Sequence, residues 1–128
     1  MSTPSKTDPL HPKAREGIKL FNLGKYYQAH DPLEEAWMDS PSPERDLYQG
    51  ILQIGLAYYQ ITRGNYRGSL KMFQLAKHNL SLLGIALLGI DIARLQADAQ
   101  SVESALRQLG STGIDQLDPE LIRPVPEI

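Results

Sequence analysis

The sequence predicts an all-α fold, a compact bundle of about five helices made of two helical hairpins plus a C-terminal helix. Three observations predict it. Apolar residues recur at three- and four-residue spacing, glycine or proline separates the segments that show this spacing, and no stretch alternates apolar and polar residues as a half-buried strand does. The 128 residues, 41% hydrophobic and 22% charged, suffice for one folded domain with a real core.

The first helical hairpin is expected just after a polar, proline-rich stretch. Residues 1–11 are predicted to form a mobile N-terminal tail. A helix over residues 12–23 begins with proline in its first turn, and Gly24 can end it in the left-handed conformation. A second helix is expected over residues 26–38.

The second hairpin is expected to hold the most buried helix. Ser42 can cap a helix over residues 43–62, which is apolar nearly all round and therefore belongs in the middle of the domain. The turn Arg63–Gly64–Asn65 ends it. Asn65 can cap a fourth helix, which stops at Gly84.

A fifth helix is expected between Asp91 as its cap and Gly110 as its stop. The apolar stretch before it, residues 80–90, contains two glycines and is far shorter than the ~20 residues of a membrane span, so it is interpreted as a buried helix end and connector. Residues 12–110 are thus predicted to be a single helical domain, followed by an extended C-terminal tail over residues 111–128.

The two hairpins share an internal repeat with a period of forty residues. It resembles the second half of a tetratricopeptide repeat, whose period is about 34 residues. Because the period is longer and only two copies occur, simple hairpin packing is favoured over a peptide-binding solenoid. The first copy has Gly24, Tyr26, Ala29, Leu33 and Ala36, and the second has Gly64, Tyr66, Ser69, Phe73 and Ala76.

Composition excludes several classes of function. The net charge is −2 and the basic residues are dispersed, which argues against a nucleic-acid partner. The chain has no cysteine, which excludes disulfides and thiolate metal sites. Neither a secretory signal nor a membrane span is recognisable, so no membrane association is expected and a cytoplasmic location is predicted.

The repeat also separates packing residues from a polar set. In the first copy, the positions between the packing residues hold His30, Asp31, Glu34 and Trp37, whereas the second copy has Leu70, Lys71, Gln74 and Lys77 there. Hairpin geometry therefore does not require the polar set. This contrast makes the first copy the candidate functional site.

His30 and Glu34 are four residues apart, so they share one face of a helix, with Trp37 one turn further on. An imidazole and a carboxylate at this spacing can hold a divalent metal ion together. A catalytic zinc site needs three protein ligands, which leaves weak carbonyl ligands from Gln49 or Gln53, or a second subunit of a homo-oligomer, to complete it.

Two alternatives to a metal stay open. His30 and Glu34 can form an internal hydrogen-bonded network with Gln53, Arg63 or Asn65, which would hold the helices in register. The same side chains can also line a site for a small non-metal ligand. A functional site, with or without a metal, would require these side chains to converge on one solvent-reachable cavity. A sealed internal network would exclude such a site.

A family resemblance is carried by two segments, FNLGKYYQAHDPLEEAW and RDLYQGILQIGLAYYQITRGNYRGSLKMF. They resemble a bacterial and archaeal family known as domain of unknown function 309, whose signature His-x-x-x-Glu-x-x-Trp is met by His30, Glu34 and Trp37. The resemblance implies an all-helical fold and a motif suggested to bind metal, with no established activity. Where the family usually has glutamate after the histidine, this chain has the shorter Asp31, which is therefore not predicted to be a ligand.

The leading hypothesis is a small helical binding domain that holds a divalent metal or a small ligand around His30 and Glu34. Two alternatives from other classes are a protein–protein adaptor that uses the tetratricopeptide-like hairpins and a metal-dependent hydrolase. The further residues expected to line the site are Trp37, Gln49, Gln53, Arg63 and Asn65.

Overall fold

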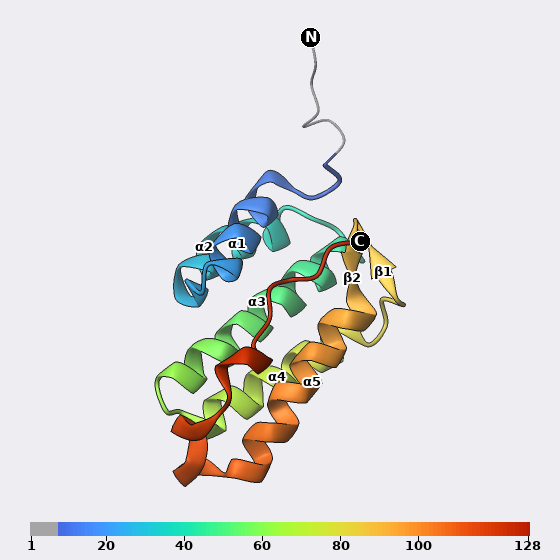
Figure 1. Ribbon diagram of the computed structural model, residues 1–128. Helices are drawn as coiled ribbons and strands as arrows, with labels where there is room; N and C mark the ends of the chain where they lie inside the picture. Colours follow the sequence, from blue (N-terminus) through green and yellow to red (C-terminus); the bar gives the residue numbers. More distant parts are fainter. Residues whose placement is uncertain (1–7) are drawn as a thin grey trace.

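The computed structural model describes residues 8–128 and contains five α-helices and one small β-hairpin (Figure 1). This confirms the predicted bundle of two helical hairpins plus a C-terminal helix. No helix within the described residues is both long and apolar enough to cross a lipid bilayer. The helices are α1 (Pro12–Asn22), α2 (Tyr26–Met38), α3 (Glu44–Thr62), α4 (Tyr66–Leu80) and α5 (Ile92–Leu109), and the strands are β1 (Ala86–Leu87) and β2 (Ile90–Asp91).

Each helical hairpin turns at a glycine. Gly24 follows α1 with a φ of 80° and Gly64 follows α3 with a φ of 72°, a conformation that a side chain would strain. Asn65 then caps α4, because its side-chain oxygen accepts a hydrogen bond from the backbone N–H of Gly68. The repeat seen in the sequence therefore corresponds to two helical hairpins of the same design.

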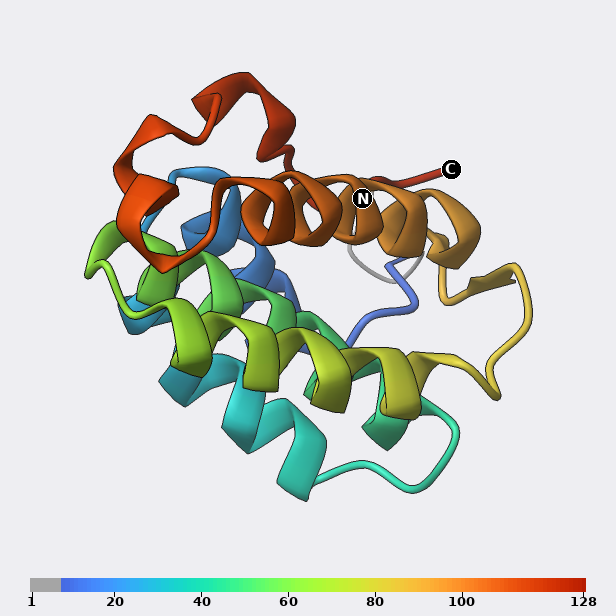
Figure 2. The same ribbon diagram turned by 90° about the horizontal axis from the view of Figure 1, so that it is seen from below.

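Helix α3 lies at the centre of the bundle, in contact with α2 and α4 (Figure 1). Helix α5 packs more sparsely and lies along one side of the bundle, where the C-terminal segment covers part of it (Figure 2). The expectation that the third helix is buried nearly all round is confirmed. Its buried apolar side chains are Leu47, Tyr48, Ile51, Leu52, Ile54, Ala57 and Tyr58.

The two helices of the first hairpin approach closely at Gly17. A methyl group added to this residue of α1 would lie only 2.5 Å from Cγ of Leu33 in α2. Leu33 is 1% exposed, so its side chain occupies the space that a larger residue at position 17 would need. This contact fixes the distance between α1 and α2, and therefore the position of α2 on the bundle.

The connector between α4 and α5 differs from the prediction, because it contains a β-hairpin where no strand was expected. Ala86 pairs with Asp91 and Leu87 with Ile90. The two residues of the turn, Leu88 and Gly89, have φ values of 54° and 81°, as a two-residue turn matched to the strand twist requires. The prediction was wrong because a leucine rather than asparagine or aspartate occupies the first turn position, so the turn had no recognisable signal.

The C-terminal segment, residues 111–128, was predicted to be extended, but only part of it is. It forms two 3₁₀-helices, Ser111–Gln116 and Pro119–Leu121, and then an extended stretch. The side chains of Ile114, Leu117 and Val125 are buried. The mobile tail expected over residues 1–11 falls mostly outside the described residues.

Arg15 in α1 ties the two ends of the described chain together. Its guanidinium donates to both carboxylate oxygens of Glu127, at 2.7 and 3.0 Å, and its Nε donates to Asp8 at 3.0 Å. The hydrogen bonds from Arg15 and from the backbone N–H of Leu10 lower the pKa of Asp8. The final residues also pair with the β-hairpin, since the backbone N–H of Ile128 donates to the carbonyl of Gly89.

Replacing Arg15 by glutamine is expected to loosen this clamp. The free energy of unfolding should fall by about 1 kcal/mol, the upper range for exposed ion pairs, because the pairing with Glu127 is bidentate. The pKa of Asp8 is lowered in the folded protein, so ionised Asp8 stabilises the fold at pH values above the ordinary aspartate pKa of about 4. This stabilisation is lost as the pH falls through the lowered pKa.

Hydrogen exchange measures the clamp directly. The backbone amides of Asp91 and Ile128, which bond across the C-terminal segment, should exchange faster in the Arg15→Gln variant. Arg94→Gln is the matched control, since Arg94 pairs only with Asp98 of its own helix among the described residues. Equal exchange in both variants would show that the clamp is not needed.

Candidate functional site

His30, Asp31 and Glu34 form a cluster on α2. Each offers one ligand atom, and the three atoms all lie within 4.8 Å of one another. His30 and Glu34 share a face because they are one helical turn apart. The side chain of His30 is 34% exposed and that of Asp31 88% exposed, so the cluster opens to solvent. One imidazole nitrogen and two carboxylate oxygens can therefore be presented to an ion.

Asp31 belongs to this cluster although it was not predicted to be a ligand. Its Oδ1 lies 3.3 Å from Nδ1 of His30. The shorter side chain was expected to fall short, but from the position next to the histidine a short carboxylate can bend back towards the imidazole ring. The adjacent His–Asp pair was the signal in the sequence that would have indicated this third group.

Buried residues on the other face of α2 hold the cluster outward. Pro32 and Leu33 are both buried, and the helix continues through Pro32 to Met38. Proline has no backbone N–H, so it cannot donate to the carbonyl of Gln28 one turn earlier. The cluster is thus carried on a helix whose inner face is fixed to the core.

Trp37 lies one turn beyond Glu34 but faces the start of α3. Its ring is half-buried, and the guanidinium carbon of Arg45 lies 5.8 Å from the ring centroid. The indole Nε1 is buried and finds no hydrogen-bond acceptor within residues 8–128. An unsatisfied buried donor is costly, yet neither carboxylate of the cluster accepts a hydrogen bond from this N–H.

Gln53 and Gln49, predicted to line the site, lie one turn apart on α3. Gln53 is buried and faces α4, where its Oε1 accepts a hydrogen bond from Nδ2 of Asn79 at 2.7 Å. Gln49 is half-buried and makes no side-chain hydrogen bond within the described part of the chain. Neither is shown as a partner of His30 or Glu34.

Arg63 and Asn65 lie at the turn between α3 and α4 and have partners there. Asn65 caps α4 and donates from Nδ2 to Oε1 of Gln60 at 3.0 Å. Arg63 donates to the hydroxyl of Tyr59 at 3.2 Å and lies over the same ring. Tyr59 in turn packs against Tyr27 of α2, with the ring centroids 5.2 Å apart and the ring planes tilted by 37°. Tyr27 lies one turn before His30.

The predicted convergence on one cavity is therefore not what the structure shows. His30, Glu34 and Trp37 line neither the cavity between α4 and α5 nor the hollow beside the turn at Arg63 and Gly64. No hydrogen bond joins His30 or Glu34 to the predicted network partners among the described residues. The side chains of Gln53, Arg63 and Asn65 bond elsewhere instead. What the structure brings together is the smaller, open group on α2.

A known domain family covers the part of the chain that carries the cluster. The model of the domain of unknown function 309 (DUF309) matches residues 14–72, which run from α1 into α4 and include the cluster on α2. No curated protein matches the chain. The family resemblance inferred from the His-x-x-x-Glu-x-x-Trp motif is confirmed, and residues 14–72 of this chain are a DUF309 domain.

Proposed function

We propose that this domain binds a divalent transition-metal ion through His30, Asp31 and Glu34. The observation that supports the proposal most directly is the gathering of an imidazole and two carboxylates within 4.8 Å on one helix. These are borderline and hard ligands of the kind that zinc, nickel and copper accept in proteins.

The spacing of the three groups is close to what one ion needs. Ligand atoms bound at about 2.1 Å to a tetrahedral ion lie roughly 3.4 Å apart, so separations that reach at most 4.8 Å have to shrink by up to about 1.4 Å. Asp31 and Glu34 carry rotatable, solvent-reachable carboxylates, which can make this adjustment without moving the backbone. Water would fill the other coordination positions.

The openness of the cluster favours binding over hydrolysis. A catalytic metal works in a shaped site that excludes bulk water, whereas the Asp31 side chain is 88% exposed. The hydrolase and adaptor alternatives stay predictions from the sequence. An exposed three-ligand site instead suits a modest-affinity metal site whose free positions accept water or another molecule.

Calorimetric titration with Zn²⁺ tests the proposal. The unaltered protein is expected to bind one ion per chain, and His30→Ala is expected to bind none. Asp31→Asn should weaken binding by at least the roughly 10- to 100-fold that loss of a supporting group costs at metal sites. Affinity should also fall as the pH is lowered, because protons compete with the metal for the imidazole and carboxylates.

Two features of the chain sharpen this experiment. His78→Ala is a matched control, because His78 is an exposed helical histidine on α4 outside the cluster. Trp37 is the only tryptophan, so quenching of its fluorescence by Cu²⁺ reports binding one turn from Glu34. Equal Zn²⁺ binding by the His30→Ala and His78→Ala variants would overturn the proposal.

A further inference from the structure

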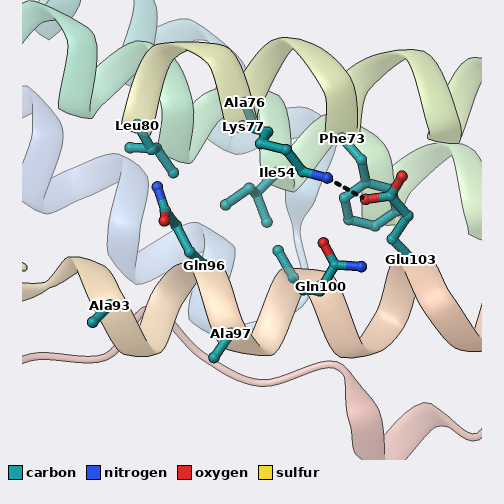
Figure 3. Close-up of a pocket in the computed structure, with 11 residues that line it drawn as sticks. Ile54, Phe73, Ala76, Lys77, Leu80, Ala93, Gln96, Ala97, Gln100 and Glu103 are labelled. Atoms are coloured by element: carbon teal, nitrogen blue, oxygen red, sulfur yellow. Dashed lines mark ion pairs between the residues drawn. The ribbon is translucent and has the colours of Figure 1, made fainter. Parts of the chain in front are cut away.

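A cavity of about 520 Å³ lies between α4 and α5, away from the cluster on α2 (Figure 3). Its apolar side is formed by Ile54 from α3 and by Phe73, Ala76 and Leu80 from α4. Only Ile54 of the lining residues falls within the DUF309 match, so the cavity is built mainly by the part of the chain that follows this domain.

Short side chains leave this space open. Ala76 of α4 and Ala99 of α5 are both buried and line the cavity, and neither reaches far enough to fill the gap between the two helices. Protein interiors are otherwise close-packed, with few voids larger than a water molecule. The volume is that of a site for a small organic molecule.

A buried carboxylate lies at one end of the cavity. The Glu103 side chain is only 4% exposed. Its Oε2 accepts from Nε2 of Gln74 at 3.2 Å and from Nε and Nη2 of Arg107 at 3.2 and 2.9 Å. Its Oε1 has only the ammonium of Lys77, at 3.7 Å, which is beyond hydrogen-bond distance. Oε1 therefore has no hydrogen-bond donor among the described residues and, unlike Nε1 of Trp37, is not sealed from solvent, so that a ligand can reach it.

The groups around Glu103 make the cavity amphiphilic. Figure 3 shows Gln96 and Gln100 of α5 directed towards α4, and Lys77 reaching along the cavity to Glu103. The Lys77 side chain is 54% exposed, and its long flexible stem can swing out to solvent. Withdrawal of this side chain would leave Oε1 of Glu103 open to another donor.

We propose that this cavity binds a small organic amine. The apolar body of the ligand packs against Ile54, Phe73 and Leu80, and its ammonium group donates to Oε1 of Glu103 in the place that Lys77 approaches. The unsatisfied oxygen favours a charged donor, because hydrogen bonds between ionised groups are the stronger ones. This site is independent of the metal proposed on α2.

Three probes with one apolar body and different head groups test the proposal, namely 4-phenylbutylamine, 4-phenylbutanol and 4-phenylbutyrate. In ¹H–¹⁵N correlation spectra, the amine is expected to shift the amides of Ala76, Ala99 and Glu103, and to bind roughly tenfold more tightly than the alcohol. The carboxylate probe should bind most weakly, because its charge meets that of Glu103. The absence of shifts at these amides with every probe would overturn the cavity as a site.

Variants separate the head-group chemistry from the cavity itself. Glu103→Gln should remove the preference for the amine, whereas Lys77→Gln should strengthen amine binding by removing the competing ammonium. If 4-phenylbutyrate binds most tightly and Lys77→Gln weakens it, the site takes anions and the proposal is wrong.

Two further variants guard against a folding defect. Ala99→Leu fills the cavity and should abolish binding of all three probes while raising or preserving the melting temperature. Glu35→Gln, an exposed glutamate on α2 outside the cavity, should change no probe affinity. Unchanged amine binding by a folded Ala99→Leu variant would place the amine elsewhere and contradict the proposal.

Discussion

Replacing Leu33 by alanine is expected to lower the free energy of unfolding by about 2–5 kcal/mol. Leu33 is 1% exposed and its side chain lies directly over Gly17 of α1, so its loss leaves a cavity between the two helices. Folded domains of this size are stable by only about 5–15 kcal/mol, so the loss is a large share of the total. Urea unfolding followed by circular dichroism measures it.

The contact with Gly17 turns this substitution into a double-mutant cycle. Gly17→Ala alone is expected to destabilise the protein, because the new methyl group would lie 2.5 Å from Cγ of Leu33. Such overpacking costs about 1–3 kcal/mol. The higher helix propensity of alanine offsets part of this cost. In the double variant the methyl group enters the space that Leu33 vacates. The summed single effects should therefore exceed the double effect by about 1 kcal/mol or more.

A leucine on the surface provides the control for this cycle. Leu75 of α4 is 40% exposed, so Leu75→Ala should change the free energy of unfolding by less than about 1 kcal/mol and should add independently to Gly17→Ala. Strict additivity of Gly17→Ala and Leu33→Ala would contradict the close approach of α1 and α2 that the structure shows.

Tyr58 is expected to destabilise the protein in alkaline solution. Its ring is 1% exposed in α3 and packs edge-on among Phe21, Tyr26 and Phe73. Burial raises the pKa of Tyr58 well above its ordinary value, with smaller contributions from the nearby Tyr26 and Asp98. The folded protein therefore keeps the phenolic proton at pH values where the unfolded chain has lost it.

The sign and size of the effect follow from this proton difference. Above about pH 10 the unfolded state binds fewer protons than the folded state, so stability is full below that pH and is lost as the pH rises. The slope contributed by Tyr58 is about 1.4 kcal/mol per pH unit until the folded-state pKa is approached. At pH 11.5 this one residue should lower the free energy of unfolding by about 2 kcal/mol.

Tyr58→Phe isolates the contribution. Its hydroxyl makes no hydrogen bond with any described residue, so the variant should be stable at neutral pH and lose less stability than the parent protein between about pH 10 and pH 12. Burial also raises the pKa of Tyr26 and Tyr48, so the variant keeps part of the slope. An equal slope in the Tyr58→Phe variant and the parent protein would show that the hydroxyl of Tyr58 is not desolvated.

Local signals predicted the helices well. The bounds of α2 and α5 agree with the prediction, and α1 and α3 differ from it by one residue at an end. Helix α4 ends at Leu80, short of the predicted stop at Gly84, because the chain turns off before the glycine. Gly24, Gly64 and Gly110 mark helix ends because each adopts a positive φ, which is a property of the residue and its immediate neighbours. Features that depend on a few adjacent residues can be inferred from sequence.

Tertiary contacts account for what the sequence did not reveal. The C-terminal segment contains Ile114, Leu117 and Val125, which are buried only because the rest of the fold offers a surface to them. Likewise, spacing cannot show that Gln53 bonds to Asn79 in another helix rather than to a residue of α2. In the candidate site, the placement of His30 and Glu34 on one face was predictable from helical periodicity, whereas the hydrogen bonds of Gln53, Arg63 and Asn65 to other residues were not.

The clamp at Arg15 has a consequence for the connectivity of the fold. Asp8 and Glu127 bind the same guanidinium, so the two ends of the described chain meet within a few ångströms of each other on α1. The path of the backbone is therefore almost a closed ring. A short linker between these ends would allow the chain to be opened at the surface turn around Gly64. The resulting circular permutant would keep the helix–helix contacts, but α4 and α5 would be synthesised before α1, α2 and α3.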